Sequence, residues 1–180
     1  VDMGHLWRLD SVAYLNFPEH GKQLIDSTML QALIRKGSPF NVSKLEQERQ
    51  RLTRLFRNQG YYFYQNSYAS YLADTVNVPG KVNVRLSMVD SIEPEAKRQW
   101  YIGNININFK KQFTEEMTDS FVRRYLSFRY AGKKIPIRAG VVLRELKLRP
   151  RKLYMVDDET TAKAGLQSMG LFSYTNLQFV

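Results

Sequence analysis

The stretch that decides the fold is RLTRLFRNQGYYFYQNSYASYLADT, residues 51–75. A helix rich in arginine is expected to end at Gly60, because glycine readily takes the positive φ that closes a helix. Six aromatic residues follow, and aromatic residues are typical of strands. They are Tyr61, Tyr62, Phe63, Tyr64, Tyr68 and Tyr71. The segment therefore predicts a strand with one set of aromatic rings in the core and the alternate set on the outer face.

One strand and two helices are predicted before this segment. Residues 7–17 alternate as a strand does, with one phase made of Trp7, Leu9, Ala13, Leu15 and Phe17. Residues 22–37 predict a helix whose apolar face consists of Ile25, Met29, Leu30, Leu33 and Ile34. A second helix is expected to begin with a capping box formed by Ser43 and Glu46.

A further strand is predicted after the aromatic segment. In residues 81–90, apolar side chains alternate with polar ones, as in a strand with one buried face. The first half therefore predicts the order β-α-α-β-β. Residues 90–99 are polar, contain a proline and lack periodicity, so they are interpreted as a linker.

The second half repeats the first. WYIGNININF (100–109) resembles the strand 7–17, and LQSMGLFSYTNLQF (166–179) repeats FRNQGYYFYQNSYA (56–69). The interval from tryptophan to glycine is 53 residues in the first copy and 70 in the second, so about 17 extra residues are expected within 110–137. These repeats predict tandem modules at 1–93 and 94–180. The second module is expected to lack its last strand, because the sequence ends at Val180.

The positive charge is concentrated in the second half. The chain has a net charge of +10, and residues 95–180 carry 16 basic and 8 acidic side chains against 11 and 9 in residues 1–94. The densest basic segment contains Arg144, Lys147, Arg149, Arg151 and Lys152. One interpretation is a solvated helix face and turn. The alternative is contact with an anionic membrane surface or an acidic partner subunit.

Composition argues against several other classes. The chain has no cysteine and only two histidines, which predicts neither disulfides nor a metal site. Its acidic clusters, 115–116 and 157–159, lack an accompanying nucleophile or base, and the second is explained as helix capping, so no catalysis and no cofactor are expected. Nucleic acid is not expected as a partner, because the aromatic segment lies in the nearly neutral half.

The order of elements and two local motifs resemble POTRA domains, the polypeptide-transport-associated modules of BamA- and TamA-like outer-membrane assembly proteins. One motif is a helix end followed by Gly60-Tyr61-Tyr62, repeated as Gly170-Leu171-Phe172. The other is the turn from Leu148 to Tyr154, in which Arg151 stands where the family usually has glycine. The sequence thus resembles two tandem α+β modules, each with two helices packed on a small mixed sheet.

The resemblance implies a role in handling polypeptides. It implies a periplasmic arm at the outer membrane of a Gram-negative bacterium, with any secretion signal and β-barrel outside these residues. Such an arm binds unfolded outer-membrane proteins or accessory assembly subunits, which add a strand to a sheet edge. The expected edge carries the six aromatic residues above together with Phe172 and Tyr174. Alternatives are a partner-recruiting POTRA module of a secretion or cell-division protein, or a nucleic-acid-binding α+β domain.

Overall fold

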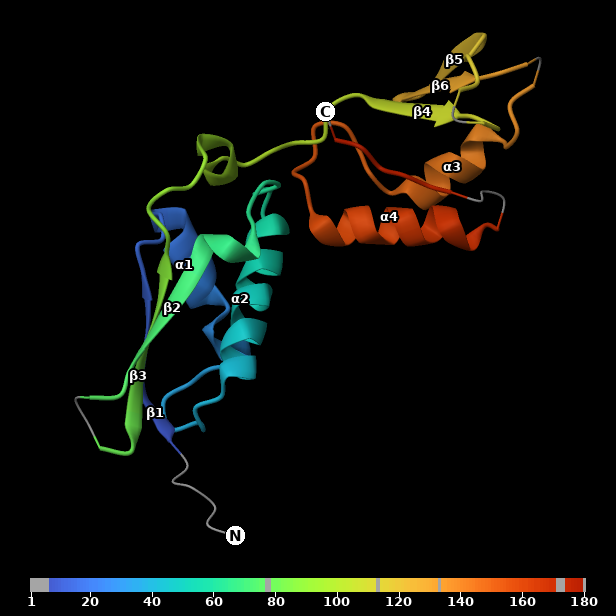
Figure 1. Ribbon diagram of the computed structural model, residues 1–180. Coiled ribbons are helices and arrows are strands. Elements are labelled where there is room, and N and C mark those ends of the chain that lie inside the picture. The colour runs from blue at the N-terminus through green and yellow to red at the C-terminus, as the bar shows by residue number, and fades with distance from the viewer. Residues whose placement is uncertain (1–6, 77–78, 113, 133, 171–173, 180) are drawn as a thin grey trace. The chain divides into compact units, whose positions relative to one another are not determined.

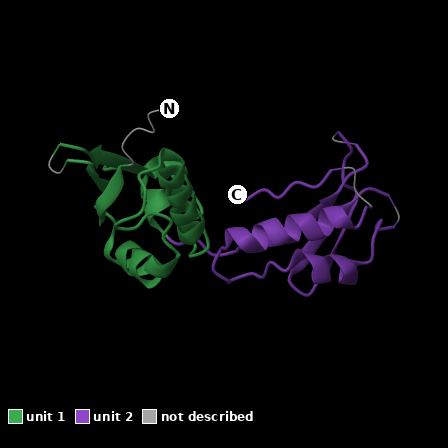
Figure 2. Ribbon diagram, turned by 90° about the horizontal axis from the view of Figure 1, so that it is seen from below, with its two compact units in different colours: residues 1–98 green, residues 99–180 purple. Residues whose placement is uncertain are grey.

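The computed structural model describes residues 7–76, 79–112, 114–132, 134–170 and 174–179. The chain divides into two compact units, residues 1–98 and 99–180 (Figure 2). The expected boundary at residue 93 falls just before η3 (Pro94–Lys97), which lies within unit 1.

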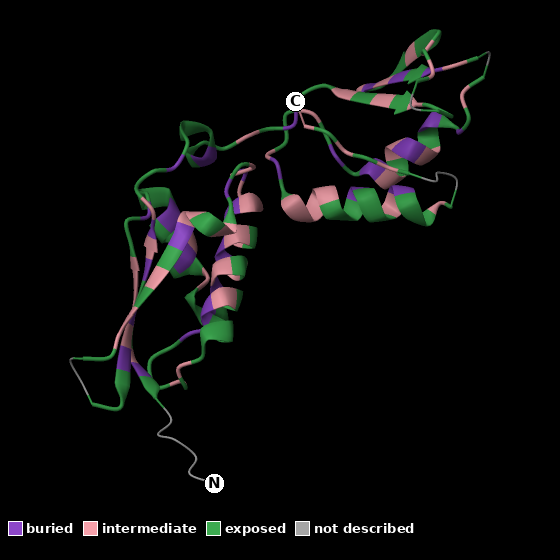
Figure 3. Ribbon diagram, in the orientation of Figure 1, coloured by how far each residue is buried: buried purple, intermediate pink, exposed green. Residues whose placement is uncertain are grey.

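Unit 1 is a three-stranded mixed sheet with helices on one face (Figure 1). The strand order is β1-β3-β2, and the central β3 runs parallel to β1 and antiparallel to β2. Val82, Val84, Leu86 and Met88 of β3 are buried against the helices, as their alternation predicted (Figure 3). Its elements besides η3 are β1 (Arg8–Leu15), α1 (Glu19–Ser27), η1 (Met29–Gln31), α2 (Val42–Arg57), η2 (Asn66–Tyr68), β2 (Ala69–Asp74) and β3 (Lys81–Met88).

A bulge in β1 changes which side chains face the core. The register with β3 shifts between Leu9 and Ser11. Leu9 is buried before the shift, whereas Val12 and Tyr14 pack on the core after it. Because an extra residue reverses the alternation of a strand, Leu15 is exposed, and the predicted phase is wrong from the bulge to the end of β1. Phe17, after the strand, is buried as predicted.

The first helix is shorter than predicted. It ends at Ser27, and Met29 and Leu30, assigned to its apolar face, are exposed, with Leu30 89% exposed. The Ser27 hydroxyl donates to the Leu24 carbonyl at 2.8 Å, and the Thr28 hydroxyl donates to the same carbonyl at 3.0 Å. Such side-chain bonds compete with helix hydrogen bonds and favour termination.

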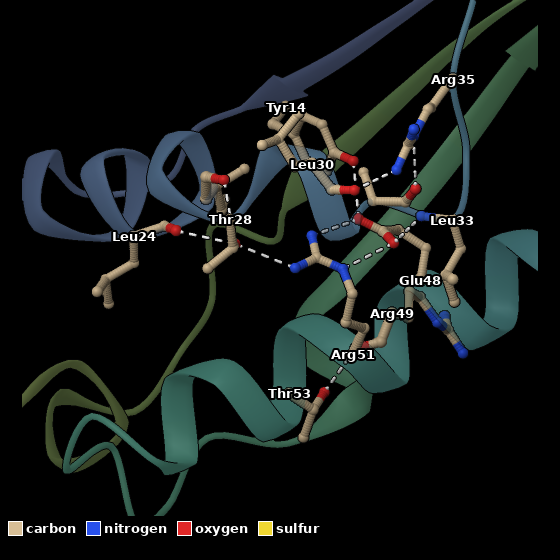
Figure 4. A network of polar contacts seen from close by, with 12 residues as sticks. Tyr14, Leu24, Thr28, Leu30, Leu33, Arg35, Glu48, Arg49, Arg51 and Thr53 are labelled. Atoms are coloured by element: carbon tan, nitrogen blue, oxygen red, sulfur yellow. Dashed lines mark hydrogen bonds and ion pairs between the residues drawn. The ribbon is translucent and has the colours of Figure 1, made fainter.

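A buried carboxylate holds the segment after α1 in place (Figure 4). Glu48 of α2 has no exposed surface, and it accepts hydrogen bonds from the Tyr14 hydroxyl at 2.8 Å and from the Leu33 N–H at 2.9 Å. Arg51 donates to both carboxylate oxygens, at 2.6 and 2.9 Å, and also to the Thr28 hydroxyl at 3.1 Å. One side chain therefore connects β1, the loop after α1 and α2.

The start of α2 differs from the predicted capping box. Asn41 is the N-cap, and its side-chain oxygen accepts from the Lys44 N–H at 3.3 Å. Glu46 instead forms an ion pair with Arg49 at 2.7 Å and accepts from the Asn66 amide at 2.7 Å. The predicted capping role of Ser43 and Glu46 is therefore wrong. Asparagine is an equally good cap, and its position one residue before the helix determines the start.

All of the predicted linker 90–99 except its last residue belongs to unit 1. Ile92 and Ala96 are buried and join the core cluster that contains Phe56 and Leu86. The interpretation of these residues as a free linker is therefore wrong. The turn of η3 brings Ile92 and Ala96 to the core. These two apolar side chains are enough to fix an otherwise polar segment on the unit.

Unit 2 contains a second three-stranded sheet with the order β4-β6-β5. The central β6 runs parallel to β4 and antiparallel to β5, as β3 does to β1 and β2. Both units are therefore α+β, with two helices and a small mixed sheet, which confirms the predicted class. The elements are β4 (Ile105–Phe109), β5 (Asp119–Arg123), β6 (Leu126–Tyr130), α3 (Ala139–Leu146) and α4 (Val156–Ser168).

The chain order of unit 2 is β-β-β-α-α, which differs from the predicted one. The region 110–137, expected to hold extra residues, supplies the hairpin β5–β6, and its turn lies at Arg124 and Tyr125. The sheet is therefore not short of a strand, because β6 takes the central place. Among the described residues after α4, 174–179 form neither helix nor strand, and Leu171–Ser173 of the predicted strand lie outside the described residues.

Candidate functional site

The outer edge of β2 offers backbone groups for an added strand. Within the described sheet, β2 pairs only with β3. The Val89 N–H donates to the Tyr68 carbonyl at 3.0 Å. In an antiparallel strand, the backbone N–H and C=O groups of alternate residues bond to the partner strand, and those of the residues between them point away from it. Since Tyr68 bonds to β3's neighbour Val89, the N–H and C=O groups of Ala69, Tyr71 and Ala73 point to the outer side.

Part of this edge is already occupied. Arg49 of α2 donates to the Ala69 carbonyl at 3.2 Å, and its guanidinium lies 5.6 Å from the centroid of the Tyr71 ring. The groups left on the outer side belong to Tyr71 and Ala73. Between them in sequence, the side chain of Leu72 is 62% exposed. The edge thus combines a short row of backbone donors and acceptors with apolar and aromatic side chains.

The prediction of one aromatic strand from residue 61 to residue 71 is wrong. Residues 61–65 form an irregular loop, η2 follows, and β2 begins only at Ala69. Local backbone turns replace the strand: the Tyr61 N–H donates to the Phe56 carbonyl at 3.2 Å, and the Tyr64 N–H donates to the Tyr61 carbonyl at 3.0 Å. These turns carry Tyr64 back over the end of α2. Of the six aromatic residues, only Tyr71 lies in the edge strand.

Three of the other aromatic residues pack on the core. Tyr64 is buried and lies 4.7 Å from Phe56 between ring centroids. Tyr61 meets Phe56 edge-on at 5.7 Å and Tyr68 meets Tyr64 edge-on at 5.8 Å. The Tyr61 hydroxyl lies 2.7 Å from Nδ1 of His20. Burial raises the pKa of Tyr61 above its usual value. These rings therefore fix the loop on unit 1.

Tyr62 and Phe63 form the outward part of the aromatic loop. Their rings meet edge-on with centroids 4.8 Å apart, and the Arg57 guanidinium lies 5.8 Å from the Tyr62 centroid. Phe63 is exposed. This pair therefore leaves aromatic surface exposed beside the end of α2.

The half-buried Tyr14 and the buried Tyr64 of unit 1 predict opposite effects of losing a hydroxyl. Burial raises the pKa of both Tyr14 and Tyr64, and the charge of Glu48 adds to the effect at Tyr14. The Tyr64 hydroxyl has no hydrogen-bond partner, whereas the Tyr14 hydroxyl donates to Glu48. We expect Tyr14→Phe to lower the free energy of unfolding by about 1.5–3 kcal/mol, and Tyr64→Phe to leave it unchanged or raise it.

Urea unfolding followed by circular dichroism checks this pair of variants. Each variant is the control for the other, because both remove one oxygen from a tyrosine that packs on the core of the same unit. Equal losses in the two variants would contradict the expectation.

The second-unit part of the predicted edge is not a described strand. Phe172 lies outside the described residues, and Tyr174 is 65% exposed in a segment without helix or strand. The edge position of both residues therefore stays a prediction.

The predicted basic residues lie on α3 and in the loop that follows it. Arg144 is on α3 and forms an ion pair with Glu145 at 3.0 Å. Lys147, the C-cap of α3, is exposed, as are Arg149, Arg151 and Lys152 in the loop to α4. Four of the five therefore share one loop, and Arg144 is separated from them by its carboxylate partner.

Sequence reasoning missed a second segment that meets this loop. Arg149 Nη1 donates to the Tyr125 hydroxyl at 2.6 Å, and the guanidinium carbon lies 5.2 Å from the Tyr125 centroid. Tyr125 occupies the turn between β5 and β6, next to Arg123 and Arg124. The run Arg123-Arg124-Tyr125 can be read in the sequence, but only the fold shows that it contacts the loop between α3 and α4.

Searches of the described residues give two further findings. No group of three or more histidine, cysteine, aspartate or glutamate side chains is placed to hold a metal ion there. Within the same residues, every helix is too short or too polar to span a bilayer.

Comparisons with known proteins give one family and two structural relatives. The family described as "POTRA: Surface antigen variable number repeat" matches residues 20–86. POTRA domains 3–5 of BamA from Haemophilus influenzae align with 94% of this chain and 53% of that chain, at 12% identity and a TM-score of 0.54. POTRA domains 1–3 of the periplasmic domain of Omp85 from Anabaena align with 95% and 58%, at 16% identity and a TM-score of 0.35. No curated protein sequence matches significantly.

These findings agree with the two-unit fold. The matched residues 20–86 run from α1 into β3 and so cover most of unit 1. The alignment with the BamA domains extends over both units, although this chain spans only about half the length of that structure. As the sequence predicted, residues 20–86 match the POTRA family, and the chain has the tandem fold of the BamA POTRA domains.

Proposed function

We propose that the chain is a non-catalytic periplasmic arm that binds extended polypeptides at the outer edge of β2. The polypeptides are unfolded outer-membrane proteins or accessory subunits of the machinery that assembles them. The observation that carries this proposal is the pair of outward-facing residues Tyr71 and Ala73 on a strand paired on one side.

The chemistry of this edge suits many different clients. The N–H and C=O groups of Tyr71 and Ala73 can pair with any backbone, so affinity depends little on the client's side chains. The exposed Leu72 offers apolar contact to a side chain of an added strand. Strands of outer-membrane barrels alternate apolar and polar residues, so their apolar face can cover Leu72.

Replacing Ala73 with proline tests the proposal. Because proline lacks an N–H, it removes an outward donor while leaving the bonds from Leu72 and Asp74 to β3 intact, and edge strands tolerate proline at such positions. We expect Ala73→Pro to weaken binding of a peptide from a barrel strand by about fivefold, since each lost backbone bond contributes about 1 kcal/mol. NMR titration of backbone amides measures the affinity and locates the site.

Ala73→Val is the matched control, because it keeps the N–H and favours a strand. It should bind the peptide as the unchanged chain does, with shifts centred on Tyr71 and Ala73. Equal affinity in the proline and valine variants, or shifts confined to the outer side of β1, would refute the proposed edge.

A further inference from the structure

Three basic residues of unit 2 adopt a backbone conformation that usually belongs to glycine. The non-glycine residues with positive φ among those described are Asn16 at 59°, Arg124 at 56°, Lys147 at 55° and Arg151 at 65°. Asparagine tolerates this region, whereas long side chains enter it at a cost.

Each of the three positions has a local geometry that favours glycine. Arg124 is the first residue of the two-residue turn between β5 and β6. Arg151 follows Pro150 in a turn closed by the bond from the Lys152 N–H to the Arg149 carbonyl at 3.3 Å. Lys147 ends α3 in the left-handed conformation. The chain thus keeps a cation at three sites where glycine would remove strain, and such strain is typical of functional sites.

The three strained residues belong to one surface. The contact of Arg149 with Tyr125 joins the α3–α4 loop to the hairpin turn. The Arg151 N–H donates to the Ile102 carbonyl at 2.7 Å, which joins the same loop to the segment that carries Tyr101. Because β4 and β6 are parallel, all three segments gather where these strands begin. We call this surface the basic end: Arg123, Arg124, Lys147, Arg149, Arg151 and Lys152, with Tyr101, Val122 and Tyr125.

The charge of the basic end is not neutralised within the described part of the protein. All six cations are exposed, and no ion pair of the described residues includes any of them. The acidic run that follows the α3–α4 loop in the sequence, 157–159, is half-buried in the first turn of α4, where carboxylates complement the helix N–H groups. Glu159 also accepts from the Tyr154 hydroxyl at 2.6 Å.

We propose that the basic end binds the headgroups of an anionic phospholipid surface. Guanidinium groups match the oxygens of phosphate in pairs, and four of the six cations are arginines. Tyr101 and Val122, 61% and 71% exposed, stand beside these cations. Tyrosine is enriched at the headgroup level of membranes, and a protruding turn beside two loops suits a planar surface. This contact is independent of the β2 edge, which belongs to the other unit.

Vesicle co-sedimentation of the full chain tests the proposal. Arg124→Gly, Lys147→Gly and Arg151→Gly in one variant remove three charges and three strained residues together. We expect binding to vesicles of equimolar phosphatidylcholine and phosphatidylglycerol to fall by about 100-fold, since each basic residue near an anionic surface contributes strongly. The thermal midpoint should rise at the same time, because glycine relieves the strain. If these three residues had only a structural role, the variant would not lose vesicle binding while its thermal midpoint rises.

The control variant replaces Lys22, Lys36 and Arg85, three exposed cations of unit 1, with glutamine. It has the same net charge as the glycine variant and should bind anionic vesicles as the unchanged chain does. Three results would overturn the proposal: no binding of the unchanged chain to anionic vesicles, equal binding by the two variants, or binding to polyglutamate but not to vesicles. The last result would identify an acidic polypeptide as the ligand.

Discussion

Glu48→Leu is expected to lower the free energy of unfolding of unit 1 by about 3–5 kcal/mol, the usual effect of removing one partner from a buried ion pair. The carboxylate is fully buried and accepts four hydrogen bonds. Its loss leaves the Arg51 guanidinium, the Leu33 N–H and the Tyr14 hydroxyl without their acceptor. Burial acts to lower the pKa of Arg51, but Glu48 outweighs burial and raises it. Without Glu48 only the effect of burial remains, yet a guanidinium stays protonated in proteins, so the variant leaves an uncompensated charge.

Chemical denaturation with Glu46→Leu as the control measures this effect. Glu46 lies on the same helix and also pairs with an arginine, but it is partly exposed. Its replacement should change stability by no more than about 1 kcal/mol. Combining Glu48→Leu with Arg51→Leu should recover part of the loss, because the uncompensated charge is removed as well. If Glu48→Leu and Glu46→Leu cost the same, the buried network does not hold β1, the loop after α1 and α2 together.

The parts of the fold that follow from local patterns were predictable. The alternation of β3, the apolar stripe of α2 and the glycine after it depend on residues close in sequence, and all three are found in the structure. Glu48 itself carried a signal, because it follows Leu45 and precedes Leu52 at helical spacing on the buried face. A charged residue at such a position predicts a buried partner, but only the fold shows that the partners come from three elements.

The parts that depend on distant contacts were not predictable from local patterns. The aromatic loop has strand-forming composition, but packing of Tyr64 against Phe56 bends it into turns before β2 starts. The basic loop was identified, whereas its contact with Tyr125 depends on the hairpin in 110–137. Comparison with unit 1 predicts only extra residues in 110–137. The reason is that unit 1 has two of its strands after the helices, whereas unit 2 has all three strands before them.

Phe128→Ala is expected to lower the free energy of unfolding of unit 2 by about 3–5 kcal/mol, as for other large aromatic residues in cores. Phe128 is fully buried in the central strand β6. Its ring stacks on Phe121 at 4.9 Å and on Phe109 at 6.3 Å between centroids, so it connects both edge strands. The effect follows if the hairpin forms the centre of the sheet, and hydrogen exchange of the β4 amides measures it.

Val122→Ala is the matched control, since Val122 lies in the same hairpin but is largely exposed. Its replacement should leave exchange at Ile105 and Ile107 unchanged, because a surface substitution away from packed contacts costs no more than about 0.5 kcal/mol. If the hairpin were a peripheral insertion on which β4 does not depend, the β4 amides would exchange equally slowly in both variants. Faster exchange in the Phe128→Ala variant alone means that β4 depends on β6, and that the same small mixed sheet is built from two different chain orders.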